Sequence, residues 1–579
     1  MIKPTDMENK PFRIGLCMAG AVSAGAYTAG VMDYLIEALE EWEKRRGTAN
    51  IPSHKVTIPI MGGASAGGMT ALLTASTLNN TITPVPIPQP AQLLDEHPEN
   101  KLYHSWVDLT SPDMLPKMLD ASDIQSGKII SLLNSNFIDE IADKMISSDV
   151  EGWKPTPVYF EEPVKVFVTL TNLEGFSYYA GFNDGKRKSK YYMSLHNDYA
   201  CFELYDDVTP REPTPGWMPL NFRTAAFLKT AKDAAMATGA FPIGLKSRIL
   251  EREPGYVNAI SWLSDVFKNT PLNPLIPVRT LHVDGGLINN EPYEKVRDLL
   301  DDTFRAEYKE ENPTAEEIDP FELNCDYNTF ENTVVMIDPF PSEINDPFDF
   351  SQDLLKVIPK TLSAMMAQMR SKKIHFRKAM KEEDGSRFII SPSRHITDEK
   401  TKEIIELFGE KAIACGALSG FGGFLNKEFR IHDYYLGRYN CEVFLRDYFT
   451  ITAEALEKNP IFAKGYEGVD AELYSSIATG EKRYQIIPIF NSDRTPGHFP
   501  MPVFSSGTSW PMIREKDIER LSKPIKSRIQ KLLLNIADLN KMNSFFLWAG
   551  AKIVLNKLLA DKVMTKIKES LNEWKLIKP

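Results

Sequence analysis

Two strand-turn-helix units in succession near the start of the 579-residue chain constrain its fold more than any other feature. In the first, the apolar stretch 12–18 runs into small residues, and apolar side chains then recur at helical spacing over 31–39. In the second, the β-branched stretch 56–61 leads through a glycine-rich turn at 62–68 into a helical pattern over 69–75. Two such units predict a parallel sheet covered by helices, which is the α/β class.

Later segments extend the predicted sheet and then give way to helices. Apolar or β-branched patterns predict strands over 164–170, over 178–192 with a turn at 183–185, over 280–283 and over 333–337. Beyond Pro339 the pattern favours long helices, predicted over 354–374 and 398–418. We therefore divide the chain into an α/β domain over 10–345, a mainly helical extension over 346–520 and a basic amphipathic helical tail over 521–579.

The sequence Gly63-Ala64-Ser65-Ala66-Gly67 fills the turn of the second unit. A G-x-S-x-G sequence between a strand and a helix presents the serine hydroxyl at the edge of the sheet, because the glycines permit a sharp turn. The helix that follows directs its N-terminal amides and positive dipole end toward that serine, where they stabilise negative charge. Ser65 is therefore the candidate nucleophile, and a small-residue turn without chemistry is the alternative.

Asp284 is the candidate base for this serine. It follows the strand predicted over 280–283 and precedes Gly285 and Gly286, so we expect its carboxylate at the same carboxyl edge of the sheet as Ser65. From these residues alone, an ordinary Asp-Gly turn is an equally good interpretation.

Together these segments resemble the patatin-like phospholipases. The positions that match that family's nucleophile turn and its D-G-G/A element are Gly63, Ser65, Gly67, Asp284, Gly285 and Gly286. Residues 235–242 are similar to the A-x-x-A-x-P segment that precedes the second element. The resemblance covers residues 12–292 in the family's order. It implies a three-layer α/β hydrolase domain with a mostly parallel sheet.

The resemblance also implies a Ser-Asp dyad in which Asp284 takes the proton of Ser65 directly, with no histidine, metal or cofactor. The family's glycine-rich oxyanion loop corresponds to residues 18–23, so the amides of Gly20 and Ala21 are expected to face the oxyanion. This loop departs from the family's usual G-G-G-x-R/K-G, because alanines flank a single glycine and no basic residue follows. Alanine keeps its amide, so the expected donors are retained.

A serine-histidine triad is a further alternative. Four histidines follow Asp284 in the order that an ordinary α/β-hydrolase requires, namely His375, His395, His432 and His498. None of the four lies in a motif that marks a catalytic histidine.

The stretch 421–438 is similar to a recurring segment in larger microbial patatin-like proteins that carry a C-terminal extension. Arg430, Asp433 and Arg438 within it have the spacing of an ion-paired face on a helix. We interpret them as a structural clamp in preference to an active-site group.

The net charge and the cysteine content limit the classes of partner and the cellular compartment that we expect. The formal net charge is −11, which disfavours a nucleic-acid partner because such binding needs a basic face. Five scattered cysteines without a C-x-x-C pair fit a reducing compartment, so we expect a cytoplasmic protein. Residues 14–31 resemble a secretory hydrophobic region, but acidic Asp6 and Glu8 before them favour the strand-turn-helix interpretation. No stretch reaches the roughly 18 uninterrupted apolar residues of a spanning helix.

The tail over 521–579 carries net charge +8, whereas the rest of the chain carries −19. Its apolar residues recur at helical spacing among lysines, which is typical of two amphipathic helices. Such helices either dock on the acidic remainder of the chain or lie on an anionic membrane surface. The docked arrangement is slightly favoured, and peripheral membrane association is the alternative.

The sequence therefore predicts a serine lipid acyl hydrolase, of the phospholipase A or lysophospholipase type, that acts through an acyl-enzyme. The substrate class, phospholipid or lysophospholipid, comes from the resemblance alone. An acyltransferase with the same dyad and a non-catalytic scaffold that binds a partner are the two alternatives. The sequence indicates no oligomeric state.

Overall fold

The computed structural model describes most of the chain between residues 10 and 578. The ranges outside the described residues are 86–99, 109–113, 126–127, 149–151, 184–187, 209–211, 312, 314–318, 342–349, 398–400, 491–500, 537–544 and all but five positions of 354–383. The helix predicted over 354–374 therefore falls almost wholly outside the described residues.

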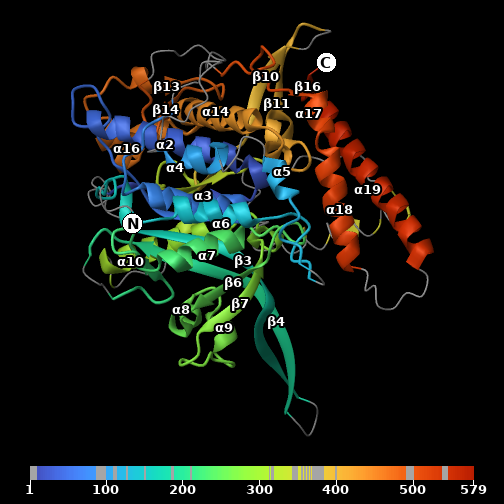
Figure 1. The fold of residues 1–579 in the computed structure, drawn as a ribbon. Helices are drawn as coiled ribbons and strands as arrows, with labels where there is room; N and C mark the ends of the chain where they lie inside the picture. The colour runs from blue at the N-terminus through green and yellow to red at the C-terminus, as the bar shows by residue number, and fades with distance from the viewer. Residues whose placement is uncertain are drawn as a thin grey trace.

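A nine-stranded sheet lies at the centre of the molecule, with its main path in the order β5-β4-β3-β2-β1-β8-β9 (Figure 1). The strands are β1 Phe12–Met18, β2 Val56–Gly63, β3 Phe160–Asn183, β4 Lys188–Leu204, β5 Met218–Leu220, β6 Arg248–Arg252, β7 Val278–Val283, β8 Asn332–Ile337 and β9 Arg387–Ile390. The run from β3 through β2, β1 and β8 to β9 is parallel. Three pairs of described strands in this sheet are antiparallel, namely β4 with β3, β7 with β3 and β6 with β7, whereas β5 pairs parallel with β4. The predicted α/β class with a mostly parallel sheet is confirmed.

Helices cover both faces of this sheet (Figure 1). One face carries α2 Gly25–Arg45, α3 Ser65–Thr77 and α7 Leu228–Thr238, and the other carries α8 Pro254–Ala259, α9 Ser264–Phe267 and α10 Tyr293–Glu311. Side chains of a strand point alternately to opposite faces. Accordingly, Leu16 and Met18 of β1 join the core beneath α2 and α3, whereas Cys17 joins a separate cluster with residues of α10. The result is a three-layer helix-sheet-helix arrangement.

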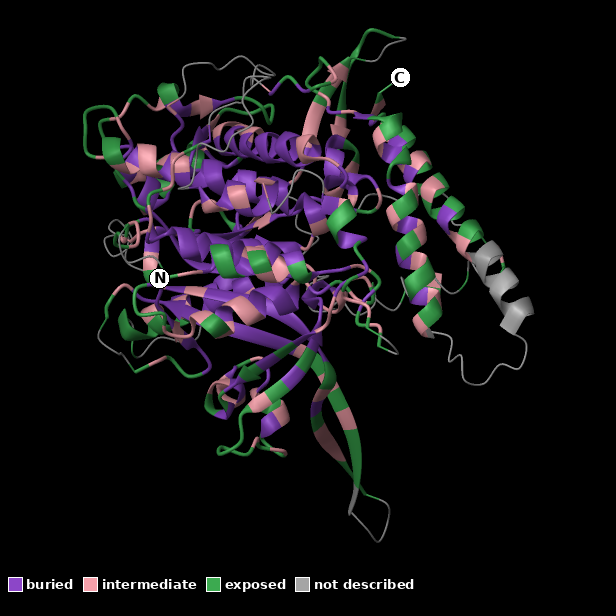
Figure 2. Cartoon of the chain, in the orientation of Figure 1, coloured by how far each residue is buried: buried purple, intermediate pink, exposed green. Residues whose placement is uncertain are grey.

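Helix α14 Lys427–Val443 packs along the outer side of α2 and forms a further layer (Figure 1). The backbones touch at two glycines, because a Cβ on Gly30 would collide with Tyr434 O and one on Gly437 would collide with Tyr27 O. Figure 2 shows that both helices are largely buried. The segment beyond residue 345 therefore packs directly on the helix that follows β1.

The extension expected to be mainly helical also contains strands. The helix predicted over 398–418 is wrong, because β11 Ile404–Phe408 pairs antiparallel with β10 Ser393–Thr397. Ile404 and Ile405 are β-branched, and this favours a strand wherever a partner strand is present. Two short 3-10 turns over 409–412 and 414–416 follow β11 in place of the helix. The extension also supplies β9, the edge strand of the central sheet.

Smaller elements complete the described chain. They are α4 Lys101–Tyr103, α5 Met114–Met118, α6 Asn136–Met145, α11 Pro320–Cys325, β12 Thr450–Thr452, α15 Ala453–Lys458, α16 Pro460–Gly465, β13 Ser475–Ser476, β14 Arg483–Gln485, β15 Ile513–Arg514, α17 Glu515–Glu519 and β16 Ile577–Lys578.

The basic tail folds into a helical hairpin of α18 Ser522–Ile536 and α19 Phe545–Glu573 (Figure 1). Arg528, which is 2% exposed, joins the hairpin to the α/β layers by donating to Asp123 Oδ1 at 2.7 Å and to Leu132 O at 2.6 Å. Strand β16 then pairs with β15. These contacts agree with the docked arrangement, in which basic residues of the tail meet acidic residues elsewhere in the chain.

The five cysteines are buried and form no disulfide. Of the helices described, none combines the length and the apolar composition needed to cross a membrane.

Candidate active site

Ser65 occupies a sharp turn between β2 and α3. Strand β2 runs to Gly63 and α3 begins at Ser65, so the turn predicted over 62–68 contracts to Ala64 alone. The Ser65 φ of 51° lies in the left-handed region, where strain of about 1–3 kcal/mol is tolerated only when the surrounding structure enforces it. A Cβ on Gly67 would collide with Met18 O, so glycine is needed where α3 passes the end of β1.

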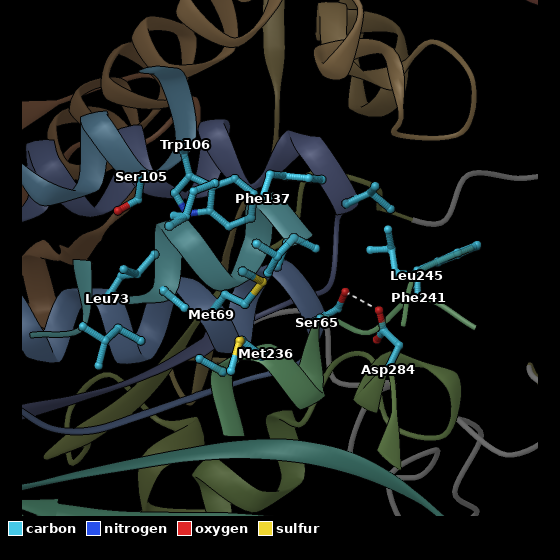
Figure 3. Close-up of a pocket in the computed structure, with 18 of the residues that line it drawn as sticks. Ser65, Met69, Leu73, Ser105, Trp106, Phe137, Met236, Phe241, Leu245 and Asp284 are labelled. Atoms are coloured by element: carbon cyan, nitrogen blue, oxygen red, sulfur yellow. Dashed lines mark hydrogen bonds between the residues drawn. The ribbon is translucent and has the colours of Figure 1, made fainter. Parts of the chain in front are cut away.

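The Asp284 side chain contacts Ser65, although the two residues follow different strands of the sheet. The Ser65 hydroxyl donates to Asp284 Oδ2 at 2.6 Å (Figure 3). The other carboxylate oxygen accepts from the Gly286 amide at 2.7 Å. Asp284 follows β7 and caps a 3-10 turn over Gly285–Leu287. Both side chains are buried, with 7% of Ser65 and 5% of Asp284 exposed. The structure therefore brings the candidate nucleophile and the candidate base into direct contact.

The segment 235–242 anchors both of these residues. The Ser65 amide donates to Thr238 Oγ1 at 2.9 Å, and the Asp284 amide donates to Ala240 O at 2.9 Å. On the opposite side, Thr171 Oγ1 donates to Asp284 O at 2.8 Å. The backbone around the Ser-Asp pair is thus fixed by hydrogen bonds from two separate segments, 235–242 and β3.

The loop after β1 lies beside Ser65, as expected for an oxyanion loop. A Cβ on Gly20 would approach Ser65 Cβ to 2.9 Å and would collide with Asn290 Oδ1, so no larger residue fits there. The Gly20 amide donates to Asn290 O at 3.3 Å. Within the described part of the chain, the Ala21 amide has no hydrogen-bond acceptor. Of the two expected oxyanion donors, the Ala21 amide is therefore the one that donates no hydrogen bond to another described residue.

An apolar cavity leads away from the Ser-Asp pair (Figure 3). It contains about 800 Å³ of space that protein atoms do not fill, its open mouth included. Its walls are mainly aliphatic, methionine and aromatic side chains, among them Met69, Leu73, Trp106, Phe137, Ile141 and Met236. Among the described residues that line it, Asp284 is the single titratable side chain. Such a cavity suits a hydrocarbon chain whose polar end reaches Ser65.

No described histidine lines this cavity. His395 is exposed on β10, and His432 is buried in α14, where its ring bonds to Asp433 Oδ1. His375 and His498 lie outside the described residues. His282, two residues before Asp284, bonds to Thr280 Oγ1, and burial lowers its pKa to about 4, so this ring is neutral near pH 7.

Metal ligands do not gather in the described ranges: no group of three or more His, Cys, Asp or Glu side chains there could hold a metal ion.

Arg430, Asp433 and Arg438 are buried in α14 and contact different parts of the chain. Asp433 accepts hydrogen bonds from the Ala414 and Cys415 amides at 2.8 Å each. Arg430 donates to Val107 O and Gly423 O, and Arg438 pairs with Asp33 and Glu37 of α2. The clamp therefore joins α14 to distant segments, whereas the sequence predicted pairing along one helix face. None of the three lines the cavity.

Two residues that hold the site in place lacked a signal in the sequence. In the sequence, Thr238 is simply one position of the 235–242 segment, with nothing to mark that its hydroxyl accepts a hydrogen bond from the Ser65 amide. Ser23 lies in the predicted oxyanion loop, but its bonding partners are about 400 positions away in the chain. That role depends on which distant segment packs beside Ser23, which the local sequence does not indicate.

The fold and the site define an α/β protein with a buried Ser-Asp pair at the end of an apolar cavity. No family model matches the chain. The chain is 32% identical over 493 residues to an uncharacterized protein, y4iI, of Sinorhizobium fredii (strain NBRC 101917 / NGR234). The match covers 77% of this chain and 66% of that protein, so the chain spans just under two thirds of its relative's length.

Proposed function

We propose that this protein is a serine acyl hydrolase of the patatin-like type, with phospholipid or lysophospholipid as substrate. One observation carries the proposal: the Ser65 hydroxyl donates to Asp284 Oδ2 at 2.6 Å, beside an apolar cavity. The strained φ of Ser65 supports it, because residues held in this conformation cluster at functional sites.

In the proposed reaction, Ser65 Oγ attacks the carbonyl carbon of the ester while its proton passes to Asp284 Oδ2. The tetrahedral intermediate then collapses, and Asp284 returns the proton to the departing alcohol. Water, deprotonated by Asp284, attacks the acyl-serine, and the bond between Ser65 Oγ and the acyl carbon breaks as Asp284 returns the proton to Ser65 Oγ, which releases the fatty acid. The Gly286 amide, which donates to Asp284 Oδ1 at 2.7 Å, keeps the carboxylate oriented in both steps.

The proposed oxyanion donors are backbone amides next to Ser65. The Ala21 amide has no acceptor within the described chain, and Ala66 lies in the first turn of α3, where amides have no acceptor inside the helix. The positive end of the α3 dipole adds to their effect. Loss of one such donor typically costs a hundredfold or more in rate.

A lipid substrate is supported by the surface around the cavity mouth. Phe241 and Leu245 line the cavity, and Ile243 between them is 75% exposed. The Leu132 amide donates to Ile243 O at 2.9 Å, so exposed Ile130 and Leu132 lie beside it. We infer that this apolar rim, comprising Ile130, Leu132, Phe241 and Ile243, rests on a lipid surface while one acyl chain enters the cavity. The rim is thus a candidate site for peripheral membrane association.

The test is fatty-acid release from mixed micelles of phospholipid and lysophospholipid. Ser65→Ala removes the nucleophile, and Asp284→Asn keeps a similar shape but cannot accept the proton. We expect both variants to lose at least a thousandfold in kcat, with unchanged thermal unfolding temperatures. Full activity in either variant would overturn the dyad. His395→Gln and His432→Gln serve as controls, and an equal loss in one of them would assign the base to a histidine.

The same assay separates the two alternatives. Added glycerol or monoacylglycerol reveals an acyltransferase, because Ser65-dependent acyl groups then appear in a new ester. A scaffold would show no Ser65-dependent release from any lipid ester, and its biological effect would survive Ser65→Ala.

A further inference from the structure

Ser23 connects the loop beside Ser65 to a segment about 400 residues further along the chain. The Ser23 amide donates to Gly420 O at 3.0 Å, and its hydroxyl donates to the same carbonyl oxygen. The hydroxyl also accepts from the Gly423 amide at 3.0 Å. Ser23 is 1% exposed, so these bonds are made away from water. Such buried bonds fix the position of the loop backbone.

The backbone on both sides of this contact is strained. Leu418, Ser419 and Gly420 are consecutive left-handed residues, with φ of 58°, 54° and 90°. Val22, which precedes Ser23 and lines the cavity, has φ of 48°, an outlier for a β-branched side chain. Strain of this kind persists only where neighbouring contacts enforce it. The 418–423 segment and the loop after β1 therefore hold each other in their observed conformations.

The 418–423 segment is itself fixed by two helices. Arg430 of α14, which is fully buried, donates to Gly423 O. Ser570 of α19 accepts a hydrogen bond from the Leu418 amide at 2.8 Å. Trp574, near the end of the tail, donates to Glu410 O at 3.2 Å, just before this segment. The end of α19 is thus connected to the loop beside Ser65 through one short segment.

We propose that Ser23 is a positioning residue, through which the 418–423 segment and α19 hold the oxyanion loop against Ser65. The proposal rests on the proposed hydrolase function for its chemical consequence. Ser23 touches no substrate, and it acts by setting where the Ala21 amide lies, which is the donor of this loop that bonds to no other described residue. Ser23 is not among the residues that line the cavity, and its neighbour Val22 is one of many apolar lining residues, so we expect binding of an acyl chain to change little.

The consequence is a specific split between kinetic constants. Ser23→Ala removes both hydroxyl contacts, so the loop amides shift relative to the oxyanion, while most of the cavity wall comes from other segments and stays in place. We expect kcat to fall on the order of tenfold and KM to stay within about twofold. Ser570→Ala removes the acceptor for the Leu418 amide and is expected to give a smaller loss of the same kind.

Matched controls separate positioning from general loss of stability. Ser76→Ala also removes a buried hydroxyl that donates to a backbone carbonyl, that of Leu73 at 2.8 Å. Thr565→Ala removes a hydroxyl of α19 that, among the residues described, bonds within its own helix alone, to Asp561 O at 2.9 Å. Both controls are expected to keep kcat. If Ser76→Ala lowers kcat as much as Ser23→Ala at a similar unfolding temperature, Ser23 has only a structural role and the proposal is overturned.

Hydrogen exchange tests the coupling between the 418–423 segment and the loop after β1 without an activity assay. Amides of residues 20–24 are expected to exchange about tenfold faster in Ser23→Ala and Ser570→Ala than in wild type, and at the wild-type rate in Thr565→Ala. Unchanged exchange in Ser23→Ala would refute the coupling itself. If the variants exchange faster but the wild type shows no Ser65-dependent hydrolysis, the coupling stands, whereas the proposed function and the effect of Ser23 on catalysis are overturned.

Discussion

Thr238 Oγ1 lies 2.9 Å from the Ser65 amide nitrogen and accepts its hydrogen bond, so the last residue of α7 anchors the first residue of α3. The same threonine packs on the turn, because a Cβ on Gly68 would come within 3.0 Å of its methyl carbon. The strained turn at Ser65 is therefore held by a side chain that takes no part in the proposed chemistry.

Thr238→Val should lower the rate of acyl release by roughly tenfold, because valine fills the same space but cannot accept the Ser65 amide. Thr238→Ser keeps the acceptor and should retain most of the activity. Fatty-acid release at saturating lipid measures the difference. Equal activity in the valine and serine variants would show that the hydrogen bond does not hold the nucleophile.

Gly20→Ala should reduce activity by about a hundredfold, because the new Cβ would collide with Asn290 and press on Ser65. Gly255→Ala in α8 is the matched control, since a Cβ there meets no atom within 4 Å. Both proteins should fold, as judged by circular dichroism, and differ in acyl release. An active Gly20→Ala protein would remove the loop after β1 from the site.

Ile243→Asn should weaken binding to anionic phospholipid vesicles by about tenfold without harming the fold. Ile243 has φ of 65° and is 75% exposed, and asparagine tolerates this conformation better than a β-branched residue. A tenfold loss is about 1.4 kcal/mol, which is part of the roughly 2 kcal/mol gained by fully burying such a side chain. Co-sedimentation with vesicles measures it, with the equally exposed Ile477→Asn as the control. Indistinguishable binding by both variants would exclude the rim as the lipid-facing surface.

Acid should destabilise the fold through His54. This ring is buried, its Nε2 donates to Ile486 O at 2.8 Å, and burial lowers its pKa to about 4. In the unfolded chain the pKa is near 6.5, so above pH 6.5 the ring is neutral in both states and protonation takes no stability from the fold. As pH falls from 6.5 toward 4, the unfolded chain binds the proton first, and up to about 3 kcal/mol of stability is lost.

Urea unfolding at pH 7.5, 6 and 5 tests this. His54→Gln keeps a donor for Ile486 O but does not titrate, so its stability should fall less steeply with acid. Buried His282, with its pKa also lowered to about 4, should leave a residual slope in that variant. The exposed His395→Gln should follow wild type. A steeper acid dependence in His54→Gln would contradict the assignment.

Much of the site could be predicted from the sequence because its geometry is local. The glycines around Ser65 and after Asp284 specify tight turns at strand ends, and strand ends gather at one edge of a sheet. That reasoning places Ser65 and Asp284 at one edge of the sheet, the resemblance pairs them as a dyad, and their 2.6 Å contact agrees with both. Thr238 and Ser23 could not be identified in this way, since their roles depend on which distant segment packs beside them.

The fold was predictable to the same extent. Periodicity indicated the two strand-turn-helix units that became β1-α2 and β2-α3. It failed for β11, because Ile404–Phe408 takes a strand conformation only with β10 as its partner. It also could not indicate that Gly30 and Gly437 bring α2 and α14 into backbone contact, since such contacts leave no periodic signal.

Strand β9 has a practical consequence for any shortened form of this protein. Residues 387–390 supply the hydrogen-bonding partner of β8, which is otherwise the outermost parallel strand on that side. A fragment ending at residue 345 would leave the β8 edge open, and an open apolar edge recruits strands from other molecules. Such a fragment should aggregate on expression. We therefore expect the α/β domain over 10–345 to need the β9 segment of the extension to stay in solution.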